Sequence, residues 1–115
     1  MPSLRTLEGK KAYQEYLAQT PVSGTCPLCE KFALRTFKLW KIVPNAFPYD
    51  AIAKEHHMLV PLRHSTEAEL TVDEIMELSG IKNHAVDQDY DWIIEAMPKN
   101  KSIADHFHLH LIVGK

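Results

Sequence analysis

Three histidines alternate with apolar residues near the C-terminal end of the sequence: His106, His108 and His110. Successive side chains of a β-strand point to opposite faces, so this spacing predicts that the three imidazoles share one face and converge on a single site. The residues predicted to face the core are Phe107, Leu109, Leu111 and Val113. Imidazoles are costly to bury without partners and repel one another when charged, so the pattern indicates a functional site.

Two kinds of site fit this pattern. One is a metal centre that uses several imidazoles. In one version of this alternative, all three histidines are ligands of a single transition metal. The other is a phosphate site in which imidazole serves as nucleophile and hydrogen-bond donor. A second group with chemical potential is Cys26-Pro-Leu-Cys29, which holds both cysteines of the sequence. This spacing predicts a metal knuckle, a redox dithiol or two inert buried thiols.

The elements that must position these residues follow from hydrophobic spacing and from capping and turn residues. Thr71 and Glu74 form a capping-box pattern, which places the start of the main helix. The expected helices cover residues 6–18 and 71–87, and the expected strands cover residues 37–43, 56–61, 92–94 and 106–113. This order predicts an α+β fold with a mainly antiparallel sheet.

Length and charge narrow the class of protein. A chain of 115 residues predicts a single domain over residues 1–115. The formal net charge of −2 gives no broad positive field, which argues against binding of a nucleic-acid duplex. No stretch approaches the roughly 20 consecutive apolar residues of a membrane helix, and residues 1–11 lack the apolar core of a secretory signal. We therefore expect a cytoplasmic protein without a membrane partner.

The histidine run, residues 106–112, resembles the motif of the histidine-triad (HIT) superfamily. This superfamily includes nucleoside phosphoramidases, dinucleoside polyphosphate hydrolases and hexose-phosphate uridylyltransferases. A second block, Asn45-Ala-Phe-Pro-Tyr49 followed by His-His-Met-Leu-Val-Pro-Leu-Arg-His at residues 56–64, is similar to the superfamily's strand that enters the site. The resemblance implies a HIT-like antiparallel sheet of about four to five strands, with one main helix and a short N-terminal helix.

The same resemblance implies roles for individual residues. His108 would be the nucleophile that attacks the α-phosphorus and forms a nucleotidyl-histidine, with its tautomer fixed by a main-chain carbonyl. His110 would hydrogen-bond the phosphate oxygens. His56 matches a histidine near the bound nucleotide, and Asn45 matches a position near the ribose. Without the resemblance, His56 would be interpreted as a partly buried strand residue and Asn45 as an ordinary turn residue.

Histidine at the third position of the triad favours a hydrolase, because the uridylyltransferases and one class of phosphorylases usually carry glutamine there. The expected substrate is a nucleoside phosphoramidate or a dinucleoside polyphosphate. Active relatives often hold phosphate with a Gly-rich loop before the triad, whereas residues 98–105 contain no glycine. Ser102 is the candidate phosphate-binding residue of that segment, beside Lys99 and Lys101. The alternatives are a nucleotide-binding module with weak or no catalysis, and a nucleotidyltransferase.

Zinc-bearing relatives have a ligand set similar to four residues of this chain: Cys26, Cys29, His64 and His106. The resemblance implies that these residues hold a structural Zn²⁺ and that the other two triad histidines do the chemistry. Members of the superfamily also commonly pair two copies edge to edge, which covers an exposed strand. We therefore expect a homodimer.

Overall fold

The computed structural model describes residues 4–19, 26–97 and 106–115. Within them, five strands form one antiparallel sheet in the order β1-β2-β3-β5-β4. The strands are β1 (Arg35–Thr36), β2 (Trp40–Pro44), β3 (Ala53–Pro61), β4 (Trp92–Ile94) and β5 (Leu109–Gly114). The expected α+β class and antiparallel sheet are confirmed, and the two-residue β1 is an addition to the four strands expected from hydrophobic spacing.

The expected short N-terminal helix and main helix are both present. The helices are α1 (Leu7–Gln19), α2 (Pro27–Glu30), the 3-10 turn η1 (Glu67–Glu69), α3 (Val72–Ile81), the π-helical turn η2 (Lys82–Val86) and α4 (Asp87–Asp89). The capping box that starts α3 forms as expected: the Glu74 amide donates to the Thr71 hydroxyl at 3.1 Å, and the Thr71 amide donates to Glu74 Oε1 at 2.8 Å. Among the described helices, none is both long and apolar enough to cross a bilayer.

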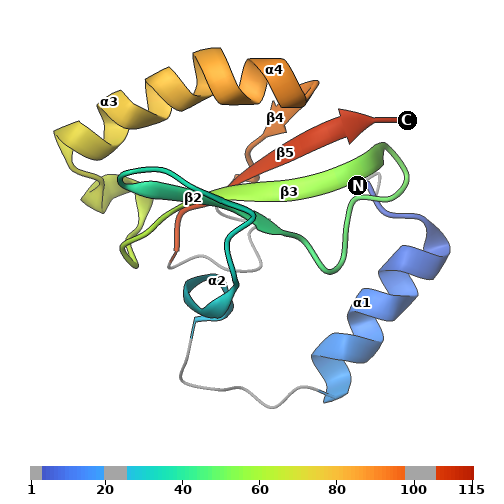
Figure 1. Cartoon of the computed structure of the whole chain (residues 1–115). Helices are drawn as coiled ribbons and strands as arrows, with labels where there is room; N and C mark the ends of the chain where they lie inside the picture. Colours follow the sequence, from blue (N-terminus) through green and yellow to red (C-terminus); the bar gives the residue numbers. More distant parts are fainter. Residues whose placement is uncertain (1–3, 20–25, 98–105) are drawn as a thin grey trace.

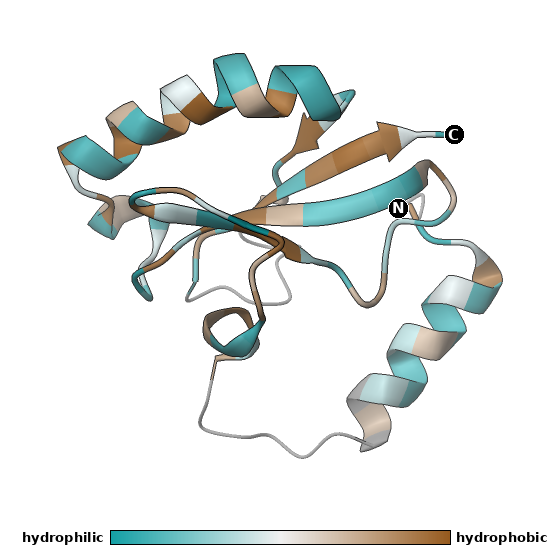
Figure 2. Cartoon of the chain, in the orientation of Figure 1, coloured by the Kyte–Doolittle hydropathy of each residue, from teal (hydrophilic) through white to brown (hydrophobic). Residues whose placement is uncertain are grey.

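The two faces of the sheet pack against different helices (Figure 1). The larger apolar cluster lies between the sheet and the α3–η2 segment; it includes Trp40, Leu59, Ile81, Phe107 and Leu111. A smaller cluster lies on the opposite face, where Leu28 of α2 packs against apolar residues of β2 and β3: Val43, Met58 and Val60. Figure 2 shows that β5 is mostly hydrophobic, whereas much of β3 is hydrophilic.

The pairing of β3 with β5 decides which histidines meet. Met58 lies opposite His110, and His56 lies opposite Ile112. Cross-strand partners share a face of an antiparallel sheet, so His56 and His110 are diagonal neighbours on the same face as Met58. Met58 belongs to the smaller apolar cluster, which places the two histidines on the α2 side of the sheet.

The predicted strand over residues 106–113 is wrong at its start. β5 begins at Leu109, so His106 and His108 precede the regular strand. The alternation nevertheless holds for the core: Phe107, Leu109 and Leu111 all enter the larger apolar cluster. The Phe107 amide donates to the Ser65 carbonyl at 2.7 Å, which fixes the backbone just before the strand and turns it toward the segment that follows β3.

Candidate active site and metal cluster

His56 and His110 form the centre of a buried polar cluster on the α2 side of the sheet. His56 Nε2 lies 2.8 Å from His110 Nδ1. The Tyr49 ring packs on both imidazoles, with its centroid 4.5 Å from the His56 ring and 4.8 Å from the His110 ring. The Tyr49 hydroxyl lies 3.2 Å from His110 Nε2. Every polar atom of the two imidazoles therefore has a partner within the fold.

The backbone fixes the proton positions of this cluster. The Tyr49 amide donates to His56 Nδ1 at 2.9 Å, so that nitrogen must carry a lone pair and the His56 proton sits on Nε2. His56 Nε2 then donates to His110 Nδ1, which leaves the His110 proton on Nε2, pointing at the Tyr49 hydroxyl. The cluster therefore presents His110 as a neutral N–H donor.

Burial keeps both imidazoles neutral. Desolvation, with the nearby Arg5 charge as the next cause, lowers the pKa of His56 to about 4. Desolvation, followed by the influence of His56, lowers the pKa of His110 to about 3. At neutral pH the proton arrangement set by the Tyr49 amide is therefore the one that persists.

His108 sits beside this pair with a fixed tautomer. Its ring centroid is 5.1 Å from that of His110, and the side chain is buried. His108 Nδ1 lies 3.0 Å from the main-chain oxygen of His106. A carbonyl only accepts, so Nδ1 carries the proton and Nε2 carries the lone pair. The main-chain carbonyl that the sequence resemblance implied is the carbonyl of His106.

Asn45 lies next to His56, but its side chain also makes the turn. Asn45 Oδ1 accepts from the Phe47 amide at 2.8 Å, which leaves Nδ2 facing His56 Nε2 at 3.3 Å. Both nitrogens carry protons in the arrangement described above, so this contact is a packing contact. The other candidate substrate-binding residue, Ser102, lies outside the described residues together with Lys99 and Lys101.

His106 belongs to a different group from the other two triad histidines. Its Nδ1 lies 3.3 Å from Cys26 Sγ and 3.4 Å from Cys29 Sγ, and His64 Nδ1 lies 3.3 Å from Cys29 Sγ. One potential ligand atom from each of these four residues lies within 4.8 Å of the others. The expectation that all three triad histidines converge on one site, and the alternative that all three bind one metal, are therefore wrong. His106 precedes the regular strand, and its ring faces the cysteines.

The donor set fits a metal ion. Two thiols and two imidazoles are the ligands of many tetrahedral zinc sites, so the cluster could hold a metal and is compatible with zinc. His106 Nε2 lies 3.2 Å from the Pro61 carbonyl, which requires a proton on Nε2 and leaves the lone pair of Nδ1 toward the sulfurs. A second contact to a carbonyl is the usual way in which proteins orient a metal-binding imidazole.

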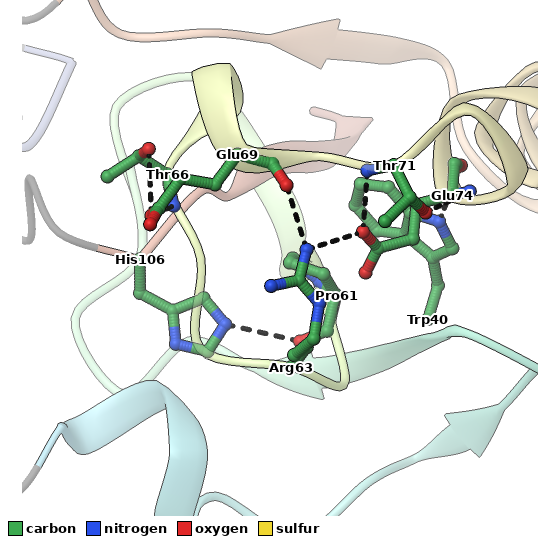
Figure 3. Close-up of polar contacts among 8 residues, drawn as sticks. All are labelled: Trp40, Pro61, Arg63, Thr66, Glu69, Thr71, Glu74 and His106. Carbon is green, nitrogen blue, oxygen red and sulfur yellow. Dashed lines mark hydrogen bonds and ion pairs between the residues drawn. The ribbon is translucent and has the colours of Figure 1, made fainter.

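Each ligand-bearing segment is anchored independently of a metal. Arg63, next to His64, donates through Nη2 to Glu74 Oε1 and to the Glu69 carbonyl, both at 2.8 Å (Figure 3). On the cysteine side, Leu28 is fully buried and Lys41 Nζ donates to the Cys29 carbonyl at 3.4 Å. The four donors are therefore held close to one another by the fold, as a preformed site requires.

Solved structures of known proteins share this arrangement of elements. A histidine triad protein from Clostridium difficile superposes with a TM-score of 0.56 at 17% identity, over 83% of this chain and 95% of that chain. A HIT family hydrolase from Legionella pneumophila gives a TM-score of 0.57 at 18% identity, over 79% of this chain and 94% of that chain. A HIT-like protein gives 0.55 at 11% identity, over 90% and 98%. No family model and no curated protein matches the sequence.

The chain has the histidine-triad fold. The resemblance seen in the sequence motifs is thereby confirmed at the level of the fold. Within this histidine-triad fold, the structure brings His56, His108 and His110 together and groups His64 and His106 with the cysteines.

Two residues of the histidine-triad site were missed from the sequence: Tyr49 and Arg5. Tyr49 was noticed only as part of a motif, although its amide and hydroxyl contact both His56 and His110. Arg5 places its guanidinium carbon 5.0 Å from the centre of the Tyr49 ring. The Phe-Pro-Tyr segment ahead of a buried histidine was a usable signal for Tyr49. Arg5 lies more than forty positions from Phe47 and Tyr49, and no local pattern indicates these contacts.

Proposed function

We propose that this protein hydrolyses a phosphoester or phosphoramidate bond of a nucleotide through a covalent intermediate on His108. The observation that carries the proposal is the 3.0 Å contact between His108 Nδ1 and the His106 carbonyl, which leaves a lone pair on Nε2 of a buried imidazole. The fold supports the coarser conclusion of a nucleotide-binding site, and the similar Legionella protein is named a hydrolase. Nucleoside phosphoramidates and dinucleoside polyphosphates are the substrate classes we favour.

The reaction proceeds in two balanced steps. In the first, His108 Nε2 bonds to the α-phosphorus as the bond to the leaving oxygen or nitrogen breaks, and the leaving group takes a proton from solvent. In the second, the oxygen of a water bonds to phosphorus while the N–P bond breaks, which returns the electron pair to Nε2. The water proton goes to solvent, and a nucleoside monophosphate leaves.

His110 stabilises the phosphate in this scheme. The Nε2–H group of His110 points at the Tyr49 hydroxyl in the structure. In the proposed complex it would donate a hydrogen bond to a phosphate oxygen. His56 holds that proton in place, because its own Nε2–H donates to His110 Nδ1. Because His110 is neutral and its Nδ1 accepts from His56, its single ring proton lies on Nε2, the nitrogen that faces the Tyr49 hydroxyl.

The cysteine and histidine cluster has a structural role in the proposal. A Zn²⁺ there would join the α2 knuckle to the segments that follow β3 and precede β5. The thiols need a reducing compartment to remain ligands, which agrees with a cytoplasmic location. Because His108 donates to the carbonyl of His106, the cluster and the nucleophile share one residue without sharing a ligand.

The decisive test is replacement of the nucleophile. We expect His108→Ala to lose more than about a thousandfold of turnover on a panel of adenosine and guanosine phosphoramidates and dinucleotides. Acid cleaves the N–P bond of a nucleotidyl-histidine, so labelled nucleotide should be trapped on wild-type protein under alkaline denaturing conditions. His84→Ala, at an exposed position in η2, is the matched control. Unchanged turnover in His108→Ala would refute the mechanism. Nucleotide binding by wild-type protein without turnover would establish the binding-module alternative instead.

We also propose that two copies pair through the edge of the sheet. β4 is an edge strand, and its residue Trp92 is 54% exposed. Such an edge presents unpaired main-chain groups, and a second copy would cover both these groups and the indole. Light scattering should give the mass of a dimer for the wild-type protein and of a monomer for Trp92→Lys. A monomeric wild-type protein at micromolar concentration would exclude the pairing.

A further inference from the structure

We propose that Arg5, in the segment just before α1, supplies the fixed positive charge with which the site selects a phosphorylated nucleotide over a nucleoside. This inference rests on the proposed nucleotide site and adds a specificity residue to it. Arginine suits this role because its guanidinium stays charged throughout the physiological pH range.

The Arg5 guanidinium packs over two aromatic rings, one of which, Tyr49, contacts the histidines of the site. Its guanidinium carbon lies 4.3 Å from the centre of the Tyr13 ring and 5.0 Å from the centre of the Tyr49 ring. Its Nε donates to the Phe47 carbonyl at 3.1 Å. Tyr49 in turn contacts His110 through its hydroxyl, so one aromatic side chain separates the charge from the proposed phosphate donor.

The backbone around Arg5 is clamped to the loop between β2 and β3. The amide and hydroxyl of Thr6 donate to the two carboxylate oxygens of Asp50, each at 2.7 Å. The Ala51 amide donates to the Leu4 carbonyl at 3.0 Å. Gly9 allows the close approach of α1, because a Cβ there would lie 2.5 Å from the Asp50 carboxylate. The residues on both sides of Arg5 are therefore held, and its position does not depend on its own side chain.

The site needs a charge that its histidines do not provide. A nucleotide brings at least one negative charge, whereas His56 and His110 are neutral at physiological pH for the reasons given above. Among the described residues, Arg5 is the permanent cation whose field acts on His56, His110 and Tyr49 alike. Lys41, the cation that acts on His106, lies on the side of the metal cluster. An anion placed between His108 and His110 would therefore lie in the field of the Arg5 charge.

The affinity for the reaction product measures the effect of the Arg5 charge without a contribution from the catalytic steps. We would measure the affinity of AMP, GMP, adenosine and guanosine by calorimetry for wild-type protein and for Arg5→Gln. Two unit charges within about 12 Å at an effective dielectric constant of about 20 change binding about tenfold or more. We expect Arg5→Gln to bind the monophosphates about tenfold more weakly, to bind the nucleosides unchanged, and to lose this difference in high salt.

Two further variants test the origin of the effect. Arg5→Lys keeps the charge and should retain most of the preference for monophosphates. Arg35→Gln is the matched control, because Arg35 also lies over an aromatic ring, 4.8 Å from the centre of Phe37, which packs against the larger apolar cluster on the α3 side of the sheet. We expect Arg35→Gln to bind all four compounds like the wild type, and thermal melts should show that every variant is folded.

The outcomes distinguish this inference from the proposed function. If wild-type protein binds the monophosphates and Arg5→Gln binds them equally well, the role of Arg5 is overturned and the nucleotide site stands. Equal weakening of monophosphates and nucleosides, or an Arg5→Lys variant as weak as Arg5→Gln, likewise overturns a role based on charge. If wild-type protein binds none of the four compounds, the nucleotide site fails, and the inference fails with it.

Discussion

Two groups of histidines lie on the same two segments of the chain and are built for different chemistry. His56 and His110 contact each other within β3 and β5, whereas His64 and His106 lie just outside the same strands and face the cysteines. Residue type does not separate the groups, and burial separates only the exposed His64, because His106 is as buried as His56 and His110. The difference lies in the partner of the second ring nitrogen.

In the metal cluster, the His106 nitrogen that faces away from the sulfurs, Nε2, contacts a carbonyl. The Pro61 carbonyl requires a proton on His106 Nε2, which directs the Nδ1 lone pair to the sulfurs. In the other group, His56 and His110, which we call the histidine site, the contact is with an amide. The Tyr49 amide requires a lone pair on His56 Nδ1, which directs an N–H toward His110. One backbone group in each case therefore decides whether the imidazole presents a lone pair suited to a metal or a proton suited to an anion.

Metal removal should give the largest difference between the two groups. We expect chelation of zinc, or Cys26→Ser, to lower the free energy of unfolding by about 4 kcal/mol, the contribution of a ligand at a thousand times its Kd. The Tm would fall by roughly 15 °C for a chain of this size. The physical reason is the loss of the link between α2 and the two segments that carry His64 and His106.

The matched variant is His56→Gln, which changes a buried histidine of the other group. It should keep one zinc per chain by elemental analysis, and its Tm should still fall on chelation. If carefully purified wild-type protein lacks stoichiometric zinc, or if its Tm does not change on chelation, the cluster does not hold a structural zinc ion.

Acid should destabilise the fold through His56 and His110, in addition to any effect on the metal cluster. The pKa values of about 4 for His56 and about 3 for His110 lie below the ordinary value, so the unfolded chain takes up protons at a higher pH than the folded protein. Stability is therefore fully present above about pH 6.5 and falls as the pH decreases toward 4. We expect each histidine to account for about 1–2 kcal/mol of this loss at pH 5, after allowance for screening by solvent.

Urea unfolding at pH 7 and pH 5 measures this loss. His56→Gln should lose about 1–2 kcal/mol less between the two pH values than the wild type, and the metal cluster, common to both proteins, cancels in the comparison. His84→Gln, at an exposed position in η2, is the control and should follow the wild type. A His56→Gln variant with the full acid loss would show that His56 is not held neutral by the fold.

The sequence predicted most of the fold because its signals are local. The capping box at Thr71 and the alternation after His106 each depend on a few neighbouring residues. The helix is confirmed, and so are the core-facing residues Phe107, Leu109 and Leu111, whereas Val113 is only half-buried and lies outside the core cluster. The grouping of His106 with the cysteines followed from the family resemblance, not from periodicity. Strand periodicity alone placed His106 with His108, because it cannot show that regular pairing begins only at Leu109.

The parts that the sequence did not predict are contacts between distant segments. Arg5 meets Phe47 and Tyr49 only because the Thr6–Asp50 clamp brings the two segments together. The proton positions depend on an amide seven residues from its acceptor, Tyr49 to His56. Both features are set by the geometry of the loop between β2 and β3, which the residue pattern does not specify.

The smallest expected effect tests how the histidine site is ordered without ligand. Tyr49→Phe keeps the ring that packs on both imidazoles and removes the hydroxyl 3.2 Å from His110 Nε2. We expect it to lower the free energy of unfolding by about 1 kcal/mol, because a buried N–H loses its partner, and to leave the zinc content unchanged. Tyr16→Phe on the exposed part of α1 is the control for loss of a hydroxyl. If Tyr49→Phe is as stable as Tyr16→Phe in urea, the hydroxyl does not satisfy His110, and the two groups of histidines then differ only in the backbone partners of His56 and His106.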